Sequence, residues 1–173
     1  LAALEELLEE IVERGEKAIV FSRSKKFTII MYEYFKDKYN PAIMHGDIPS
    51  QAKEGEEVSE RQRQVDKFQE DETCKVIFVC ESAGREGWTG TASSNVIFTS
   101  KPWAAAYVSQ CIGRCWRFGQ NGGSSGSVNV YTLIARGTID ERIEELLAEK
   151  QFLMNSTVDA PISTERVLEI LRG

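Results

Sequence analysis

The chain has 173 residues and a net charge of −6; 42% of its residues are hydrophobic and 28% are charged. This composition supports a core of its own and excludes a chain that is disordered throughout. The longest apolar runs, such as residues 76–80, are far shorter than the roughly 20 residues that span a bilayer, and no secretory leader is visible, so we expect an intracellular protein without a membrane partner.

The spacing of apolar residues predicts an alternation of helices and strands. Leucines and an isoleucine recur at three- and four-residue steps over residues 1–14, as in an amphipathic helix. Ser24 and Ser59 are expected to cap two later helices. The predicted elements are helix 1–14, strand 17–21, helix 24–36, strand 42–45, helix 60–69, strand 75–80, strand 95–99, helix 103–117, strand 128–134, and helices 138–153 and 163–171. A start inside a helical pattern, without Met, indicates a piece of a longer protein.

This alternation predicts an α/β fold in which helices cover both faces of a mostly parallel sheet, because parallel neighbours need crossover connections. We expect an N-terminal helix at 1–16 that packs on the lobe, a central lobe at 17–137, and C-terminal helices at 138–173 that brace it. Ligands gather at the carboxyl ends of the strands in such sheets, so the chemistry is expected in the loops at that edge.

The four cysteines form no C-x-x-C pair, and His45 is the single histidine. Zinc sites usually combine such ligands at short spacings. We therefore expect buried free thiols and no metal held by this chain.

The residues from 110 to 120 carry the densest chemical signal. On a helix, Gln110, Arg114 and Arg117 share one face. Paired guanidinium groups beside an amide suit a polyphosphate, although arginines in a last helical turn can also simply complement the helix dipole. Gly113 costs roughly 1 kcal/mol inside a helix, which indicates that something approaches its backbone.

A second signal lies in residues 82–91, directly after the apolar strand at 75–80. Small residues there allow backbone amides to approach an anion closely. A plain tight turn is the alternative.

These segments form a recognisable set in a fixed order. They are Phe21-Ser22, His45-Gly46-Asp47, Arg61 with Val65 and Phe68, Ala83-Gly84 with Gly87, Trp103, residues 110–120, and residues 137–143. Over roughly residues 17–152, the chain resembles the C-terminal RecA-like lobe of superfamily-two helicases, most closely SWI/SNF-type ATP-dependent DNA translocases. The resemblance implies a RecA-like three-layer fold.

The resemblance also implies roles for individual residues. Arg114 and Arg117 are similar to the catalytic arginines that reach across a cleft to ATP on the other lobe, and Gln110, Gly87 and Gly113 would also face the nucleotide. The residues expected to bind nucleic acid are Ser22, Arg23, Ser82, Gly84 and Thr89.

The partners follow from the same resemblance. The chain has no Gly-Lys pair of a phosphate-binding loop, so ATP and Mg²⁺ would be held mainly by an N-terminal RecA-like lobe of the same protein, and the isolated chain is expected to be inactive. The expected partner is double-stranded DNA, the expected state is a monomer, and the expected location is the cytoplasm, nucleoid or nucleus.

Departures from the family pattern leave alternatives open. Arg85 replaces a glycine, Thr89-Gly90 replaces Asn-Leu, and residues 48–58 contain a surface insertion to which we assign no catalytic role. The alternatives are an RNA helicase lobe and a non-catalytic interaction module that uses exposed tryptophans. A small-molecule enzyme of the Rossmann type has little support, because the first strand is not followed by G-x-G-x-x-G.

Overall fold

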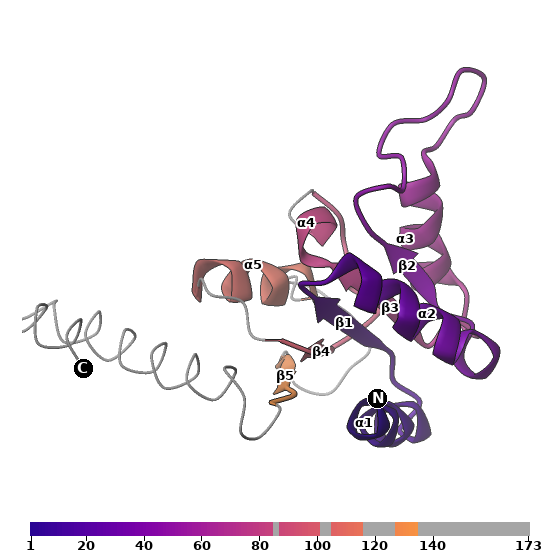
Figure 1. The fold of residues 1–173 in the computed structure, drawn as a ribbon. Coiled ribbons are helices and arrows are strands. Elements are labelled where there is room, and N and C mark those ends of the chain that lie inside the picture. The colour runs from indigo at the N-terminus through magenta and orange to yellow at the C-terminus, as the bar shows by residue number, and fades with distance from the viewer. Residues whose placement is uncertain (85–86, 101–104, 116–126, 135–173) are drawn as a thin grey trace, which may run out of the picture. The chain divides into compact units, whose positions relative to one another are not determined.

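The computed structural model describes residues 1–84, 87–100, 105–115 and 127–134. Figure 1 shows a sheet at the centre of this part, with helices packed on it. The helices are α1 (Ala2–Glu13), α2 (Lys25–Tyr39), α3 (Glu60–Glu70), α4 (Glu81–Gly84) and α5 (Ala105–Cys115). The strands are β1 (Ala18–Ser22), β2 (Ala42–Met44), β3 (Val76–Cys80), β4 (Asn95–Phe98) and β5 (Asn129–Thr132).

The five strands form one parallel sheet in the order β2-β3-β1-β4-β5. The chain crosses over β1 between β3 and β4, so β1 lies in the middle. β1, β3 and β4 are buried along their whole length, as expected for strands that are covered on both faces. The predicted α/β class, with helices on both faces of a parallel sheet, is confirmed.

Two apolar clusters lie on opposite faces of the sheet because successive strand side chains alternate. Ala18 and Val20 of β1 join the cluster that contains the buried residues of α1 and α2. Ile19 and Phe21 join the cluster that contains residues from α3, α4 and α5. The described part of the chain therefore has three layers, with α1 and α2 on one face of the sheet and α3 to α5 on the other.

The caps predicted from the sequence are present. The Ser24 Oγ accepts a hydrogen bond from the Phe27 amide at 3.3 Å, and the Ser59 Oγ accepts one from the Gln62 amide at 3.1 Å. Helix α2 extends three residues beyond the predicted end, to Tyr39, and the left-handed Asn40 (φ 44°) then ends it. Sequence reasoning missed α4, a single turn.

Several predictions lie outside the described residues. These are the helices over 138–153 and 163–171, the end of the helix predicted to reach residue 117, and the side chains of Arg85, Trp103, Trp116 and Arg117. The insertion at residues 48–58 forms the long excursion between β2 and α3 in Figure 1. Within the described ranges, no helix is long and apolar enough to pass through a bilayer.

Candidate functional site

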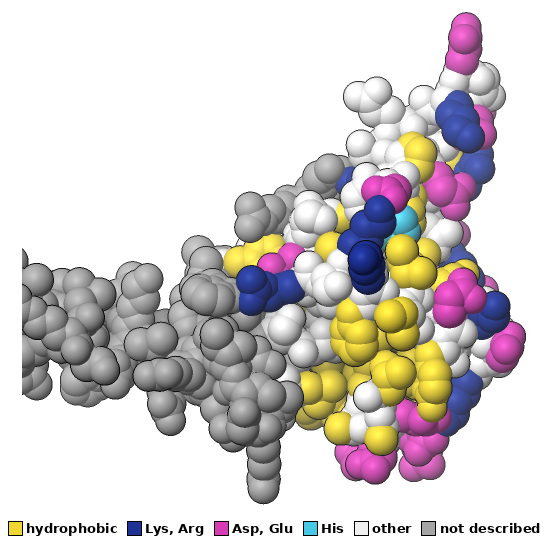
Figure 2. Space-filling model, in the orientation of Figure 1, with side chains coloured by type: hydrophobic (Ala, Val, Ile, Leu, Met, Phe, Trp, Pro, Cys, Tyr) yellow, Lys and Arg dark blue, Asp and Glu magenta, His cyan; other side chains and the backbone are white. Residues whose placement is uncertain are grey.

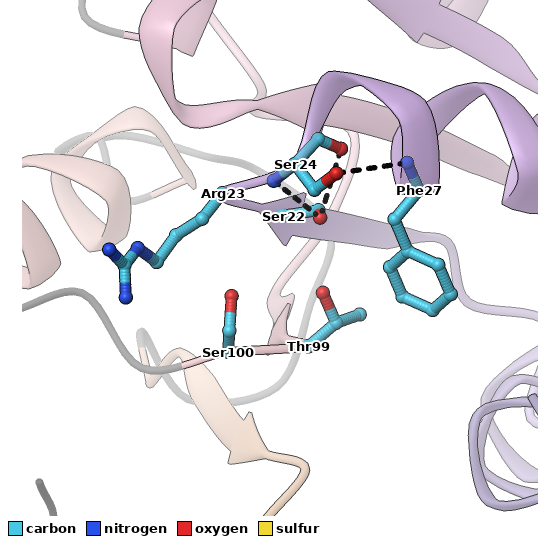
Figure 3. A pocket seen from close by; sticks show the side chains of 6 residues that line it. All are labelled: Ser22, Arg23, Ser24, Phe27, Thr99 and Ser100. Atoms are coloured by element: carbon cyan, nitrogen blue, oxygen red, sulfur yellow. Dashed lines mark hydrogen bonds between the residues drawn. The ribbon is translucent and has the colours of Figure 1, made fainter. Parts of the chain in front are cut away.

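The carboxyl edge of the sheet contains a hollow between β1 and β4. β1 leads into α2 on one face of the sheet, whereas β4 precedes α5, which packs on the other face. After these two neighbouring strands, the chain therefore turns to opposite faces of the sheet. The crevice that forms between two such strands is where open α/β sheets bind ligands. The hollow has a volume of about 370 Å³ (Figure 3), and its lining residues are Ser22, Arg23, Ser24, Phe27, Thr99 and Ser100.

Hydroxyl groups shape this hollow through short-range hydrogen bonds. The buried Ser22 Oγ accepts a hydrogen bond from the Ser24 amide at 3.2 Å, and the Ser24 Oγ in turn caps α2. The Thr99 hydroxyl donates to the Phe21 carbonyl at 3.1 Å, which ties the two strand ends together. Arg23 is exposed and, in Figure 3, extends away from the serines. The Ser22 hydroxyl therefore holds the turn, and Arg23 provides the charge.

Basic side chains gather beside the hollow. Lys25 and Lys26 are exposed at the start of α2, and Lys25 forms an ion pair with Asp47. This pair lowers the pKa of Asp47. The His45 Nδ1 accepts a hydrogen bond from the Asp47 amide at 3.3 Å, and burial lowers the pKa of His45. Figure 2 shows the histidine in cyan next to dark-blue basic side chains.

The segment after β3 contains an exposed serine, Ser82, and a buried glycine, Gly84. Ser82 Oγ lies 3.4 Å from the Cys80 Sγ, and a Cβ built on Gly46 would lie 4.0 Å from that oxygen, so the loops after β2 and β3 meet here. A Cβ on Gly84 would lie only 2.9 Å from the Tyr107 Oη. Packing of the core against α5 therefore explains the glycine at position 84.

Helix α5 presents one polar face. Tyr107, Cys111 and Cys115 are buried, whereas Gln110 and Gly113 are exposed, and a Cβ on Gly113 would meet no described atom within 4 Å. The backbone of Gly113 is therefore open to approach from outside the described part of the lobe.

Arg114 lies beside this face and is half-buried. Its Nη1 donates a hydrogen bond to the Trp88 carbonyl at 3.3 Å, and its own carbonyl accepts one from the Gly90 amide at 3.0 Å. The two segments with the strongest chemical signals are thus joined directly. Gly87 is exposed, and the carbonyl of half-buried Thr89 accepts a hydrogen bond from Gln69, a residue that carries no motif signal in the sequence.

The four cysteines are buried free thiols, as predicted. Burial raises the pKa of Cys111 to about 11 and that of Cys115 to about 12, so both thiols stay protonated at neutral pH. In the described ranges, no three His, Cys, Asp or Glu side chains cluster in a way that could hold a metal.

Comparisons with known proteins relate the chain to a family. Residues 1–119 match the family described as the helicase conserved C-terminal domain. The protein CHROMATIN REMODELING 20 of Arabidopsis thaliana is 33% identical over 172 residues, which cover 90% of this chain and 11% of that protein. The chain spans about a tenth of the length of the curated relatives that it matches.

Two solved structures share the fold. The C-terminal part of the Fun30 ATPase domain is 28% identical with a TM-score of 0.69, covering 84% of this chain and 44% of that chain. The SWI2/SNF2 ATPase core domain of Sulfolobus solfataricus is 26% identical with a TM-score of 0.65, covering 96% of this chain and 33% of that chain.

Proposed function

Because the chain belongs to the helicase conserved C-terminal domain family, we propose that it is the second motor lobe of an ATP-dependent DNA translocase. The similarities confirm the predicted resemblance to the C-terminal lobes of SWI/SNF-type ATPases. The relatives are much longer than this chain, which leaves room for a first lobe that holds ATP and Mg²⁺. We propose that the full protein acts inside the cell, on DNA, as a monomer.

The polar face of α5 carries the proposal for the nucleotide. Gln110 and Gly113 are exposed there, Arg114 flanks them, and the open backbone at Gly113 supports the approach of a second lobe with its bound phosphates. Arg117, which lies outside the described residues, is proposed to act with Arg114 on the strength of its helical spacing and of the family resemblance. Arginines placed in this way accelerate phosphoryl transfer by roughly 10³- to 10⁵-fold, since they stabilise the charge that develops in the transition state.

The hollow and its basic rim support the proposal for DNA. Arg23 would contact a backbone phosphate, and exposed Ser82 and half-buried Thr89 would approach the same strand. Ser22 and Gly84 are buried, so their part would be to shape the backbone that faces the DNA. The net charge of −6 makes a strong contact by this lobe alone unfavourable, because affinity for DNA comes largely from neutralised phosphates.

The test uses the full two-lobed protein. Arg114→Ala and Arg117→Ala are each expected to lower DNA-stimulated ATP hydrolysis by about 10³-fold. The matched control is Arg14→Ala, because Arg14 is an exposed arginine at the end of α1, next to Glu16. Folded variants of both arginines with full activity would instead favour a non-catalytic interaction module. Stimulation by duplex RNA rather than duplex DNA would favour the RNA helicase alternative.

A further inference from the structure

The side chain of Gln69 makes three hydrogen bonds with the segment that follows α4. Its Nε2 donates to the Thr89 carbonyl at 2.9 Å and to the Thr91 Oγ1 at 3.2 Å, and its Oε1 accepts from the Ala92 amide at 2.7 Å. Gln69 lies at the end of α3, 20 to 23 residues before these partners. A primary amide both donates and accepts, which suits it to hold a backbone segment in this way.

The other side of the same segment is tied to α5. The Trp88 carbonyl accepts from Arg114, and the Gly90 amide donates to the Arg114 carbonyl. Residues 88–92, which we call the clamped loop, are thus held between the last turns of two helices.

Packing leaves the clamped loop little room to shift. Trp88 is 8% exposed and lies in the core cluster with Phe21. A Cβ on Gly90 would lie 2.6 Å from the Ile19 Cδ1 and 3.0 Å from the Trp88 Cζ3. The large ring of Trp88 therefore occupies the space beside position 90, so only a residue without a side chain fits at position 90 without displacing its neighbours.

We propose that Gln69 is a positioning residue that couples the two sides of the motor lobe. By fixing the clamped loop, it holds Thr89 on the DNA side and Arg114 on the nucleotide side in one arrangement. This inference rests on the proposed function. Its consequence is that Gln69, which would touch neither DNA nor ATP, controls how strongly DNA stimulates hydrolysis.

The experiment compares Gln69→Ala with wild type in the full two-lobed protein. We expect the stimulation ratio, the kcat with saturating duplex DNA over the kcat without it, to fall by about tenfold, less than the roughly 10²-fold cost of a 1 Å misplacement. The KM for ATP is expected to stay within about twofold, since ground-state binding lies mainly on the other lobe. Gln69→Glu keeps the acceptor for Ala92 but sets a carboxylate oxygen against the Thr89 carbonyl, so its stimulation ratio should fall at least as far as that of Gln69→Ala.

The matched control is Gln62→Ala. Gln62 is exposed on the same helix, and its side-chain amide donates a hydrogen bond to the Asp66 Oδ1 at 2.7 Å, within α3 itself. Its stimulation ratio should equal that of wild type.

Amide hydrogen exchange supplies a readout that does not depend on enzymatic activity. It can also be measured on a variant whose melting temperature is lower than that of wild type. In Gln69→Ala, held well below its melting temperature, exchange should become faster in the clamped loop and also at the end of α5 around Arg114. Faster exchange confined to the clamped loop, or a wild-type stimulation ratio in Gln69→Ala, would overturn the coupling.

Arg114→Ala separates this inference from the proposed function. If Arg114→Ala is inactive while Gln69→Ala behaves as wild type, only the coupling is wrong. If folded Arg114→Ala and Arg117→Ala both retain full activity, the proposed function and the coupling are both wrong.

Discussion

Two segments of the lobe, the Ser22–Ser24 turn and the clamped loop, are built in different ways. The turn at Ser22–Ser24 is held by bonds between residues two or three positions apart, and it borders an open hollow. The clamped loop is held by partners 20 or more residues away in α3 and α5, and its tryptophan is buried. An open turn can receive a ligand without disturbing the core, whereas a clamped loop transmits a displacement to the helices that hold it.

The largest difference between the two segments should appear on changing a glycine. Gly90→Ala places a methyl group against buried Ile19 and Trp88, so we expect it to lower the free energy of unfolding by about 1–3 kcal/mol. Urea unfolding followed by circular dichroism measures this. The matched variant Gly113→Ala meets open space on a helix and should raise the free energy of unfolding by up to about 1 kcal/mol. Equal effects at both positions would show that the clamped loop is not tightly packed.

A smaller effect is expected on the open side. Arg23 is exposed at the rim of the hollow, so Arg23→Ala should leave the melting temperature unchanged. In the full protein it should weaken DNA binding by roughly five- to tenfold near 0.1 M salt and reduce the salt-dependence slope by about 1, as the loss of one phosphate contact does. Fluorescence anisotropy over a salt series measures both quantities, with Arg14→Ala as the control. An unchanged slope would remove Arg23 from the DNA interface.

The smallest expected effect concerns His45, which directly follows β2. Burial lowers its pKa below the ordinary value of 6.5, with a further lowering by Lys25 and Arg61 that Asp47 opposes. The unfolded chain therefore takes up the proton first, so this group reduces stability as the pH falls through about 6.5 and has no effect well above it. Between about pH 7.5 and 5.5, His45→Gln should lose less free energy of unfolding than wild type, by under about 1 kcal/mol. A steeper loss in the variant would contradict this sign.

The sequence was informative wherever a structure depends on neighbouring residues. Ser24 and Ser59 cap their helices as predicted, and the alternation of elements gave the layer order, because caps and periodicity are local signals. The clamped loop shows where such reasoning ends. Its bonds join Gln69 to residues 20 or more positions later, and no spacing rule relates them.

The candidate site was predictable to a similar extent. Helical spacing predicts that Gln110, Arg114 and Arg117 share one face; Gln110 is exposed and Arg114 half-buried in the structure, and Arg117 lies outside the described residues. The bond from Arg114 to the Trp88 carbonyl depends on two segments that meet only in the folded chain. Gly84 was assigned from the family pattern to nucleic acid, and the structure gives it a packing reason as well, since Tyr107 leaves no space for a side chain. The roles of these residues in binding and catalysis stay predictions.

The central claim is that this lobe provides positive charge to the phosphates of ATP only as the transition state forms. The most direct measurement is the affinity of the full two-lobed protein, with DNA, for MgADP–aluminium fluoride, which imitates that state. We expect Arg114→Ala and Arg117→Ala to weaken binding of this analogue by at least about 10²-fold while the affinity for MgADP changes by less than about threefold. Analogue binding as tight as in wild type, in both folded variants, would contradict the account.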